Sequence, residues 1–391
     1  MAKRKVPTGK VLDQAVIVVK QFIKAGATPG AAVLVGRHDR IVLDRGLGHL
    51  SYRDDAPPVT SETIYDLASL TKVLVTTTLA MLYYERGLLD LDGPVKDYIA
   101  EFHGGDKDQV RIKDLLAHCS GLVWWADLHK RFEGKTPDET KVKYLQAICE
   151  MPLNYPPRTR AVYSDLGFIL LGEILERIGK EQLDTLAKTC IFEPLGMSET
   201  TFRPRFSDNI APTEEDEWRG RTVQGEVHDE NAHAMGGVAG HAGLFSTAQD
   251  LAVLGGLLTN RGMLEMCDFE PRSGVPCGAR STPIRTRFLD EETIRRFTAR
   301  AGLESSRALG WDTPSGQSSS GDYFSAQSYG HTGFTGTSIW IDPELDLFVI
   351  LLTNRVNPTR DHTRHIPFRR AVHDLAIAAI SDREISPRDS R

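Results

Sequence analysis

The feature that most constrains the fold of this sequence is the placement of its β-type segments, which lie near both ends of the chain. Apolar runs that favour strands occupy residues 31–35 and 41–43 near the N-terminus, and residues 337–341 and 347–352 near the C-terminus. A short turn-like stretch separates the members of each pair, so each pair predicts a β-hairpin. Because strands must bury their apolar faces in a common core, we expect the two termini to form one body.

Helical patterns occupy most of the remaining chain. Apolar residues recur at helical spacing in the middle segments 112–117, 141–150 and 166–178, and near the ends in 11–25 and 369–380. The sequence therefore predicts an α+β fold, an antiparallel β-sheet flanked by helices with an inserted helical region. We assign residues 1–95 and 235–391 to the body formed by both termini, and residues 96–234 to the inserted, mainly helical region.

One long stretch, residues 262–328, is polar and carries no clear periodicity. Residues 271–278 are rich in turn-forming residues, and residues 315–321 consist largely of Ser and Gly. We expect this part of the chain to form long surface excursions.

Composition limits the classes of function. The 391 residues are 40% hydrophobic and 26% charged, which is ordinary for a globular protein with a large core. The net charge of −6 gives no electrostatic reason to expect nucleic acid or an anionic membrane as a partner. No stretch reaches the roughly 20 consecutive apolar residues of a membrane-spanning helix.

Cysteine usage and the N-terminal residues bear on the compartment. The five cysteines are scattered, odd in number and form no C-x-x-C, which favours reduced thiols over a disulfide framework or a zinc site. The apolar run at residues 16–19 is shorter than the roughly 7–15 residues of a signal-peptide core. We therefore expect a cytoplasmic protein, or one from which a leader has been trimmed.

Ser69 and Lys72 form the only S-x-x-K motif in the sequence. Apolar residues on one helical face follow from Leu70 to Tyr84, and Gly87 is a suitable helix stop. Ser69 is thus expected at a helix N-terminus with Lys72 one turn further on the same side, where a lysine can take the serine proton. Alone the motif is weak, because Ser commonly caps helices and Lys commonly lies on their surfaces.

Two further short motifs follow along the chain. Y-S-D at residues 163–165 comes after a proline-rich turn and before an apolar helix, although Tyr163 could equally be a packed aromatic. H-T-G at residues 331–333 opens the β-rich run 337–341. Small residues such as Gly333 let a substrate lie along a strand edge, where a backbone N–H can donate to an oxyanion.

In this order, the three motifs resemble those of the class C β-lactamase superfamily of serine hydrolases, which includes carboxylesterases and D-peptidases. Three stretches typical of that family lie at residues 112–122, 192–197 and 239–251. The resemblance spans residues 29–352 and implies a β-lactamase/transpeptidase-like fold. It also implies that Ser69 is the nucleophile, that Lys72 is its partner, and that Tyr163 passes protons between nucleophile, leaving group and deacylating water.

Two positions depart from the family pattern. Asp165 stands where Asn is usual, and because a carboxylate can only accept hydrogen bonds, it could bind substrate, hold Lys72 charged or cap the next helix. His331 stands where Lys is usual, and a mostly neutral histidine argues against an optimised β-lactamase. The resemblance further implies an oxyanion hole made by the main-chain N–H groups of Ser69 and Phe334.

A cluster of histidines and acids lies between the second and third motifs. His228, His233 and His241, with Asp229 and Glu230, could suggest a metal site. Their spacing does not place two ligands on one helical face, as H-E-x-x-H would, so structural histidines are favoured. Neither a metal nor another cofactor is expected.

Other polar and aromatic residues leave alternatives open. Trp124 could line the substrate cleft or be a core or surface aromatic. Asn354 and Arg355 follow the last strand and could place a fixed cation near the cleft or form a structural turn. His362 and His365 lie in an arginine-rich tail and are expected at the surface.

Together these features predict a serine hydrolase that forms an acyl-enzyme on Ser69. The favoured substrates are small carboxylic esters or amide and peptide bonds, with esterase-type activity foremost. A true β-lactamase or a D-Ala-D-Ala carboxypeptidase is the alternative within the same class. A protein of another class, a penicillin-binding cell-wall sensor without turnover, is the remaining alternative. The expected partner is a small-molecule ester, amide or peptidoglycan-derived substrate, and nothing in the sequence specifies an oligomer.

Overall fold

The computed structural model describes residues 9–37, 40–265, 285–316 and 318–380. At its centre lies a five-stranded antiparallel sheet with the strand order β2-β1-β11-β10-β9. Its strands are β1 (Gly30–Arg37), β2 (Arg40–Gly48), β9 (Tyr329–Thr332), β10 (Ser338–Asp342) and β11 (Leu347–Thr353). The predicted α+β class and both predicted hairpins are confirmed, because β1 pairs with β2 and β10 with β11.

β11 lies in the middle of the sheet, between β1 and β10, and all of its residues are buried. A strand covered on both faces requires the unbroken apolar run that the sequence shows at 347–352. Alternate residues of β1 enter two different cores: Ala32 and Leu34 enter the larger one, whereas Ala31 and Val33 enter the smaller one. Both faces of the sheet are therefore covered.

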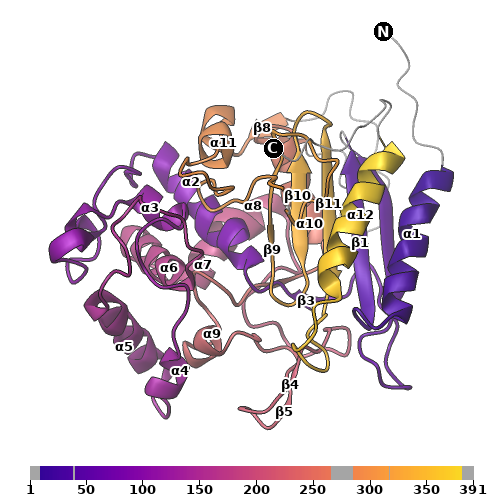
Figure 1. The fold of residues 1–391 in the computed structure, drawn as a ribbon, viewed down its shortest axis with the longest axis horizontal. Helices are drawn as coiled ribbons and strands as arrows, with labels where there is room; N and C mark the ends of the chain where they lie inside the picture. Colours follow the sequence, from indigo (N-terminus) through magenta and orange to yellow (C-terminus); the bar gives the residue numbers. More distant parts are fainter. Residues whose placement is uncertain (1–8, 38–39, 266–284, 317, 381–391) are drawn as a thin grey trace.

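The two terminal helices cover one face of this sheet. α1 (Gly9–Lys24) and α12 (His365–Ile380) lie side by side (Figure 1), and the ring of Phe22 stacks on that of Phe368 with centroids 4.9 Å apart. α10 (Ala248–Thr259) covers the opposite face. Both terminal helices were expected from their periodicity.

Across the described ranges, no helix combines the length and the apolar composition needed to cross a membrane.

Most of the regular secondary structure described between β2 and β9 is helical, and much of it lies beside the sheet (Figure 1). Its helices are η1 (Lys72–Thr77), α2 (Thr78–Glu85), η2 (Val95–Asp97), η3 (Gly105–Gln109), α3 (Ile112–Leu116), α4 (Leu128–Arg131), α5 (Pro137–Glu150), α6 (Asp165–Gly179), α7 (Leu183–Ala187), η4 (Lys188–Phe192), α8 (Glu193–Leu195), α9 (Glu230–Ala234) and, after α10, α11 (Glu291–Thr298). Short antiparallel pairs join β3 (Tyr65–Asp66) to β6 (Phe245–Ser246), β4 (Glu215–Asp216) to β5 (Arg221–Thr222), and β7 (Met263–Glu265) to β8 (Arg285–Arg287). One continuous apolar core runs from the sheet into the helices, and the limits 96–234 of the inserted region stay a prediction.

The expectation of long surface excursions over 262–328 is wrong for much of the described part. α11 directs Phe297 into the core, and Trp311 is fully buried. A helix of two turns and single aromatic residues among Ser and Gly give too little periodicity to be recognised. The turn-rich stretch 271–278 lies outside the described residues.

The third motif lies at the end of one strand and not at the start of the next. β9 ends at Thr332, and the chain turns through Gly333 before β10 begins at Ser338. The prediction that H-T-G opens the run at 337–341 is therefore wrong. β9 is a four-residue edge strand that contains Gly330, so its conformation depends on pairing with β10 more than on its own propensity.

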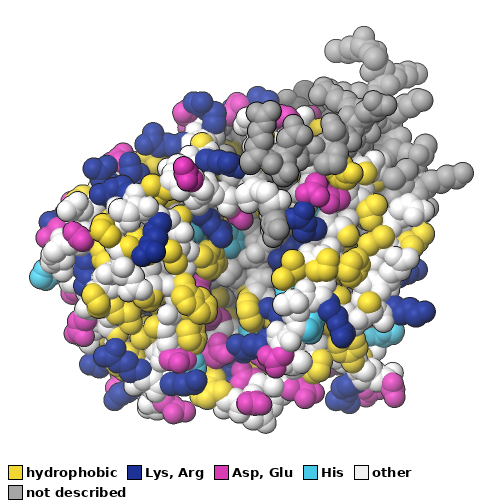
Figure 2. Space-filling view, viewed as in Figure 1, with side chains coloured by type: hydrophobic (Ala, Val, Ile, Leu, Met, Phe, Trp, Pro, Cys, Tyr) yellow, Lys and Arg dark blue, Asp and Glu magenta, His cyan; other side chains and the backbone are white. Residues whose placement is uncertain are grey.

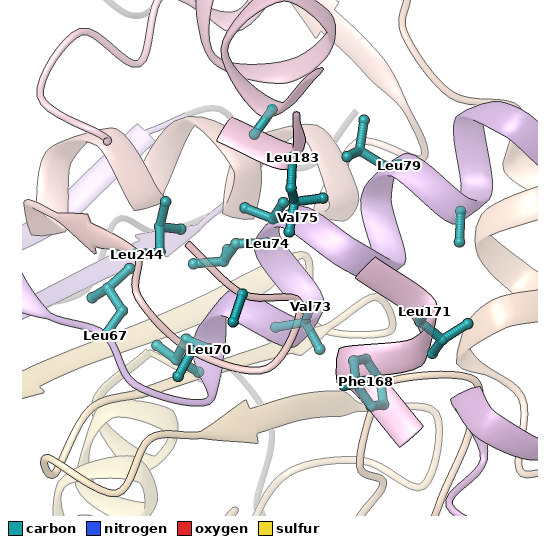
Figure 3. Close-up of a cluster of buried hydrophobic side chains, with 14 of the residues drawn as sticks. Leu67, Leu70, Val73, Leu74, Val75, Leu79, Phe168, Leu171, Leu183 and Leu244 are labelled. Carbon is teal, nitrogen blue, oxygen red and sulfur yellow. The ribbon is translucent and has the colours of Figure 1, made fainter. Parts of the chain in front are cut away.

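A buried helix, η1 continued by α2, follows Ser69. All of its residues from Leu70 to Met81 are buried. Figure 3 shows its first apolar side chains packed in a cluster that also contains Phe168 of α6. The predicted one-sided apolar stripe is thus too narrow, since this helix is enclosed on all sides and buries polar residues such as Lys72 and Thr76 as well. The predicted stop at Gly87 is confirmed, with φ of 66° directly after the helix.

Candidate active site

Ser69 lies in a tight turn directly before this helix. Asp66 fixes the turn, because its Oδ1 accepts a hydrogen bond from the main-chain N–H of Ala68 at 2.8 Å. Ala68 adopts the left-handed conformation with φ of 47°, which is strained for a residue with a Cβ and persists only where neighbouring contacts enforce it. Ser69 is thereby held at the helix N-terminus, as predicted, and its side chain lines a cleft.

Lys72 lies one turn further along and is fully buried. Its Nζ donates hydrogen bonds to Ser69 Oγ and to the carbonyl oxygen of His241, each at 2.9 Å, and lies 2.6 Å from Asp165 Oδ1. The Tyr163 side chain interacts with both Lys72 and Ser69, and Lys72 Nζ lies 5.0 Å from the centre of its ring. The structure therefore brings together the three residues predicted to carry the chemistry.

The protonation of this cluster follows from its contacts. Burial lowers the pKa of Lys72, but Asp165 and Tyr163 outweigh burial, so the net pKa is raised. Burial raises the pKa of Tyr163, Lys72 opposes that effect and Asp165 adds to it, so this pKa is raised as well. At neutral pH Lys72 is therefore charged and Tyr163 neutral. Because Lys72 and Tyr163 are in contact, they titrate as one coupled pair. This pair must first lose a proton before it can accept the hydroxyl proton of Ser69.

Asp165 has a clear partner in this cluster. Of its three proposed roles, the structure shows the contact with Lys72. The helix-cap role is wrong, because Ser164 is the N-cap of α6 and its Oγ accepts the Gly167 N–H. Asp165 also lines the cleft, so a contact with substrate stays a prediction.

We expect Asp165→Asn to move the acid limb of the pH profile of kcat/KM to lower pH by about 1–3 units. A neighbouring charge usually shifts a pKa by this amount. The carboxylate raises the pKa of both Lys72 and Tyr163, so its removal lets the cluster lose its proton at lower pH. A pH profile with a neutral p-nitrophenyl ester measures this. Asp312→Asn is the matched control, because it removes a carboxylate from the same cleft. An unmoved or upward-shifted limb in Asp165→Asn would contradict the pairing.

His331 lies at the end of β9 and is almost fully buried in the cleft wall. Its Nδ1 lies 2.8 Å from the carbonyl oxygen of Thr332, and since a carbonyl can only accept, Nδ1 carries the proton. Burial, then the charges of Arg307 and Lys72, hold the pKa of His331 well below its usual value. The third motif therefore presents a neutral imidazole, as expected for a histidine at this position.

The turn after His331 is tied to the turn that carries Ser69. Thr335 Oγ1 donates to the carbonyl oxygen of Asp66 at 2.7 Å, and Thr337 Oγ1 donates to that of Leu67 at 3.1 Å. A Cβ on Gly333 would lie 2.5 Å from the Leu67 carbonyl oxygen, so only glycine permits this approach. Gly333 lines the cleft as well, which leaves its predicted role beside the substrate open.

These hydrogen bonds fix the positions of the two predicted oxyanion donors. Within the described part of the chain, neither the Ser69 nor the Phe334 main-chain N–H donates a hydrogen bond. Both residues line the same cleft. Two unengaged N–H groups at one cleft provide the kind of donor pair that stabilises a tetrahedral oxyanion.

We expect Thr337→Val to lower kcat/KM roughly tenfold, because small displacements of catalytic groups cost up to about 100-fold. The substitution should also cost about 0.5–1.5 kcal/mol of unfolding free energy, because it removes one of the two hydrogen bonds that the Leu67 carbonyl oxygen accepts, the other coming from the Leu70 N–H. Ester hydrolysis and denaturant unfolding measure the two effects. Thr298→Val removes a similar hydroxyl contact within α11, away from the cleft, and should leave activity unchanged. Full activity in Thr337→Val would show that the tie is dispensable.

The three motifs meet in a cleft of about 690 Å³. Figure 2 shows this face of the molecule hollowed between the helical part and the sheet. Trp124 lines the cleft with 61% of its surface exposed, so the core alternative is wrong, and a contact with substrate stays a prediction. Its ring stacks on that of Trp125, with centroids 5.8 Å apart.

Asn354 and Arg355 have separate roles. The buried Asn354 Nδ2 donates to the carbonyl oxygens of Leu50 and Pro212, both at 2.7 Å, which makes it a structural connector. Arg355 instead lines the cleft. The chain after β11 therefore provides both the structural turn and the cleft cation that the sequence left as alternatives.

Sequence reasoning missed three further arginines of the cleft, Arg307, Arg360 and Arg369. They come from separate segments and belong to no recognisable motif, so no local signal marks them.

The expectation that His362 and His365 are surface residues is also wrong. Both are half-buried, and His365 lines the cleft because the chain folds back over it between β11 and α12.

The histidines between the second and third motifs have individual partners. His228 Nε2 lies 2.9 Å from Glu214, His241 Nε2 lies 2.9 Å from Asp229, and His233 Nδ1 lies 3.6 Å from Glu226. Among the residues that the structure describes, no three such side chains gather where a metal ion could be held. Each of these histidines is thus paired with one carboxylate near the cleft. The His241 carbonyl oxygen also accepts a hydrogen bond from Lys72.

Comparison with known proteins agrees with this geometry. The model of the beta-lactamase family matches residues 18–374. A protein of Salmonella gallinarum named "Putative D-alanyl-D-alanine carboxypeptidase" is 35% identical over 373 residues, covering 86% of this chain and 81% of the relative.

Solved structures share the fold. EstCE1, described as a hydrolase with promiscuous acyltransferase activity, has a TM-score of 0.72 at 21% identity, over 94% of this chain and 99% of its own. A penicillin-binding protein homologue from Caulobacter crescentus has a TM-score of 0.69 at 19% identity, over 96% and 99%. The family match across nearly the whole chain shows that this protein belongs to the beta-lactamase family and is a serine hydrolase.

Proposed function

We propose that this protein cleaves carboxylic esters and amide or peptide bonds through an acyl-enzyme on Ser69. The observation that supports this most is the contact of Ser69 Oγ with the buried Lys72 ammonium and the Tyr163 hydroxyl. A serine hydroxyl becomes a useful nucleophile only when a neighbour takes its proton, and these are the groups in reach.

The reaction proceeds in two steps. Ser69 Oγ attacks the carbonyl carbon and transfers its proton to the Lys72–Tyr163 cluster in its deprotonated form. The oxyanion receives hydrogen bonds from the main-chain N–H groups of Ser69 and Phe334. Tyr163 then protonates the leaving group, and the same cluster later removes a proton from the water that hydrolyses the acyl-enzyme.

The wall of the cleft favours some substrates over others. Neutral His331 leaves the third motif without a permanent cation, which favours ester or peptide cleavage over optimised β-lactam turnover. D-Ala-D-Ala carboxypeptidase activity is the second candidate, because relatives at 34–35% identity carry that name. We propose a small ester, amide or peptidoglycan-derived molecule as the partner, with no role for nucleic acid or membrane.

We also propose that the protein works in a reducing compartment such as the cytoplasm. Cys119, Cys149 and Cys190 carry free thiols, and burial raises the pKa of Cys119 to about 12, which keeps that thiol unreactive. Free buried thiols are typical of reducing compartments. Cell fractionation tests this, and recovery of the protein outside the cytoplasm would contradict it.

A substrate panel tests the proposed activity. We expect steady hydrolysis of p-nitrophenyl acetate and butyrate, release of D-Ala from an acetylated D-Ala-D-Ala peptide, and slow or no turnover of nitrocefin. A single acylation burst without further product would instead support the cell-wall sensor. Rapid nitrocefin turnover exceeding that of the esters would support a true β-lactamase and contradict the role given to His331.

A further inference from the structure

Two of the groups that contact the Lys72 ammonium can only accept hydrogen bonds. Its Nζ donates to the main-chain carbonyl oxygen of His241 at 2.9 Å and lies 2.6 Å from Asp165 Oδ1. Ser69 Oγ, also at 2.9 Å, can donate as well as accept. When Lys72 loses a proton, the carbonyl and the carboxylate hold its two remaining N–H groups, and its lone pair is left for a hydroxyl such as that of Ser69. The position of the His241 carbonyl therefore bears directly on proton transfer from Ser69.

The chain that carries this carbonyl lies close against two helices. Thr76, on the helix after Ser69, donates from its Oγ1 to the carbonyl oxygen of Gly240 at 2.6 Å. A Cβ on Gly240 would clash with the carbonyl oxygen of Phe168 on α6, so only glycine permits this approach. The backbone beside His241 is thus held between the helix of Lys72 and α6.

The His241 side chain adds a further anchor. The residue is 1% exposed, and its Nε2 lies 2.9 Å from Asp229 Oδ1. A carboxylate can only accept, so Nε2 carries the proton that forms this bond. The other ring nitrogen, Nδ1, has no hydrogen-bond partner among the described residues. Within the described chain, the bond to Asp229 therefore orients the ring and, through it, the backbone of residue 241.

Asp229 is itself held in place. It is the N-cap of α9, and its Oδ1 also accepts a hydrogen bond from the Ala232 N–H at 2.7 Å. Burial raises the pKa of Asp229, but contact with His241, the Ala232 N–H and the charge of Lys72 outweigh burial, so the net pKa is lowered. Asp229 is therefore an ionised acceptor at neutral pH. The start of α9 thus provides a fixed point for the His241 ring.

We propose that His241 and Asp229 form a positioning pair for Lys72. The pair fixes the His241 carbonyl oxygen, and this oxygen keeps the lone pair of the neutral Lys72 amine directed at Ser69. The inference rests on the proposed roles of Ser69 and Lys72, and it adds two residues that lie outside the three motifs. In this role neither His241 nor Asp229 exchanges a proton with the substrate, so both are positioning residues.

Two substitutions of His241 separate positioning from proton transfer. His241→Ala removes the bond to Asp229, and we expect the second-order rate of fluorophosphonate labelling at Ser69 to fall about 10- to 100-fold, the cost of a small displacement of a catalytic group. His241→Gln keeps an amide N–H that can reach Asp229 but has no basic nitrogen. It should recover most of the lost rate. We expect kcat/KM for p-nitrophenyl acetate to follow the labelling rate in both variants.

His233→Ala is the control variant. His233 also pairs with a carboxylate, since its Nδ1 lies 3.6 Å from Glu226, but it is not among the described residues that line the cleft. This variant should label at the wild-type rate. Wild-type labelling of His241→Ala would overturn the proposal, even with a lowered unfolding temperature, because the pair would then be only structural. Equal losses in His241→Ala and His241→Gln would also overturn it, because His241 would then act through its basic nitrogen.

Asp229 provides the same comparison if His241→Ala does not fold. Asp229→Asn keeps an acceptor oxygen and a residue suited to cap α9, whereas Asp229→Ala loses both. We expect slow labelling of Asp229→Ala and most of the wild-type rate in Asp229→Asn, and equal rates in the two would contradict the pairing. Labelling requires no turnover. If the wild type is labelled at Ser69 but hydrolyses neither esters nor peptides, the proposed function fails, and the labelling rates still decide the role of the pair.

Discussion

Ser69→Ala is expected to lower kcat/KM for a neutral p-nitrophenyl ester by about 10,000-fold or more, the range found when a serine nucleophile is removed. The variant keeps the cleft and the two oxyanion donors but has no oxygen to acylate. Its fold should be unaffected, because Ser69 is only partly buried and its hydroxyl contacts the Lys72–Tyr163 cluster alone. Steady-state kinetics and thermal unfolding measure the two expectations.

Ser51→Ala is the control for this experiment, because it removes a hydroxyl whose contact is with a neighbouring backbone N–H in an exposed turn. It should retain wild-type kinetics. If Ser69→Ala keeps more than about a tenth of the wild-type rate while remaining folded, another group carries the nucleophilic step, since losing a nucleophile costs far more.

Lys72→Met is expected to lower kcat/KM about 100- to 10,000-fold, the usual contribution of a general base. It also removes one member of a buried ion pair, because Lys72 is fully buried and the Asp165 side chain is only 13% exposed. Leaving one charge of such a pair without its partner costs about 3–5 kcal/mol. We therefore expect a clear loss of unfolding free energy, measured in denaturant, together with the loss of activity.

A second substitution separates these two effects. Lys72→Met combined with Asp165→Asn leaves no unpaired charge, so the double variant should recover most of the lost stability without recovering activity. If the double variant is as unstable as Lys72→Met, the ion pair is not the source of the cost. If it regains activity, Lys72 is not needed for proton transfer.

The sequence predicted those parts of the site that depend on short-range geometry. An S-x-x-K at the start of a helix places Lys72 on the same side as Ser69, and the structure has the two side chains in contact at 2.9 Å. Long unbroken apolar runs likewise predicted β1 and β11, because a strand covered on both faces needs them. These are the features for which local pattern and final fold agree.

Features that depend on tertiary neighbours could not be read from the sequence. The conformation of β9 depends on pairing with β10, so the position of H-T-G relative to the strands was wrongly predicted. The ion pair of Asp165 with Lys72 depends on how α6 packs beside the helix after Ser69, so the sequence left it as one of three alternatives. Complete enclosure of the helix after Ser69 also needs elements that lie far away in the sequence.

The charges of the cleft show this limit most clearly. Arg307, Arg355 and Arg369 precede β9, follow β11 and lie on α12, respectively, and they meet at one cleft only in the folded chain. In the sequence each is one arginine among many, and a surface position is the usual expectation for arginine. Arg369 is chemically distinctive because it is buried and because the described part of the chain supplies it with no carboxylate partner, and both are properties of the folded chain.

The central claim, that Ser69 is the acylated nucleophile, is tested most directly by labelling with a fluorophosphonate and locating the adduct by mass spectrometry. We predict one adduct per chain, on the peptide that contains Ser69, and no stoichiometric labelling of Ser69→Ala. An adduct on a different serine of the wild type, or full labelling of Ser69→Ala, would contradict the account.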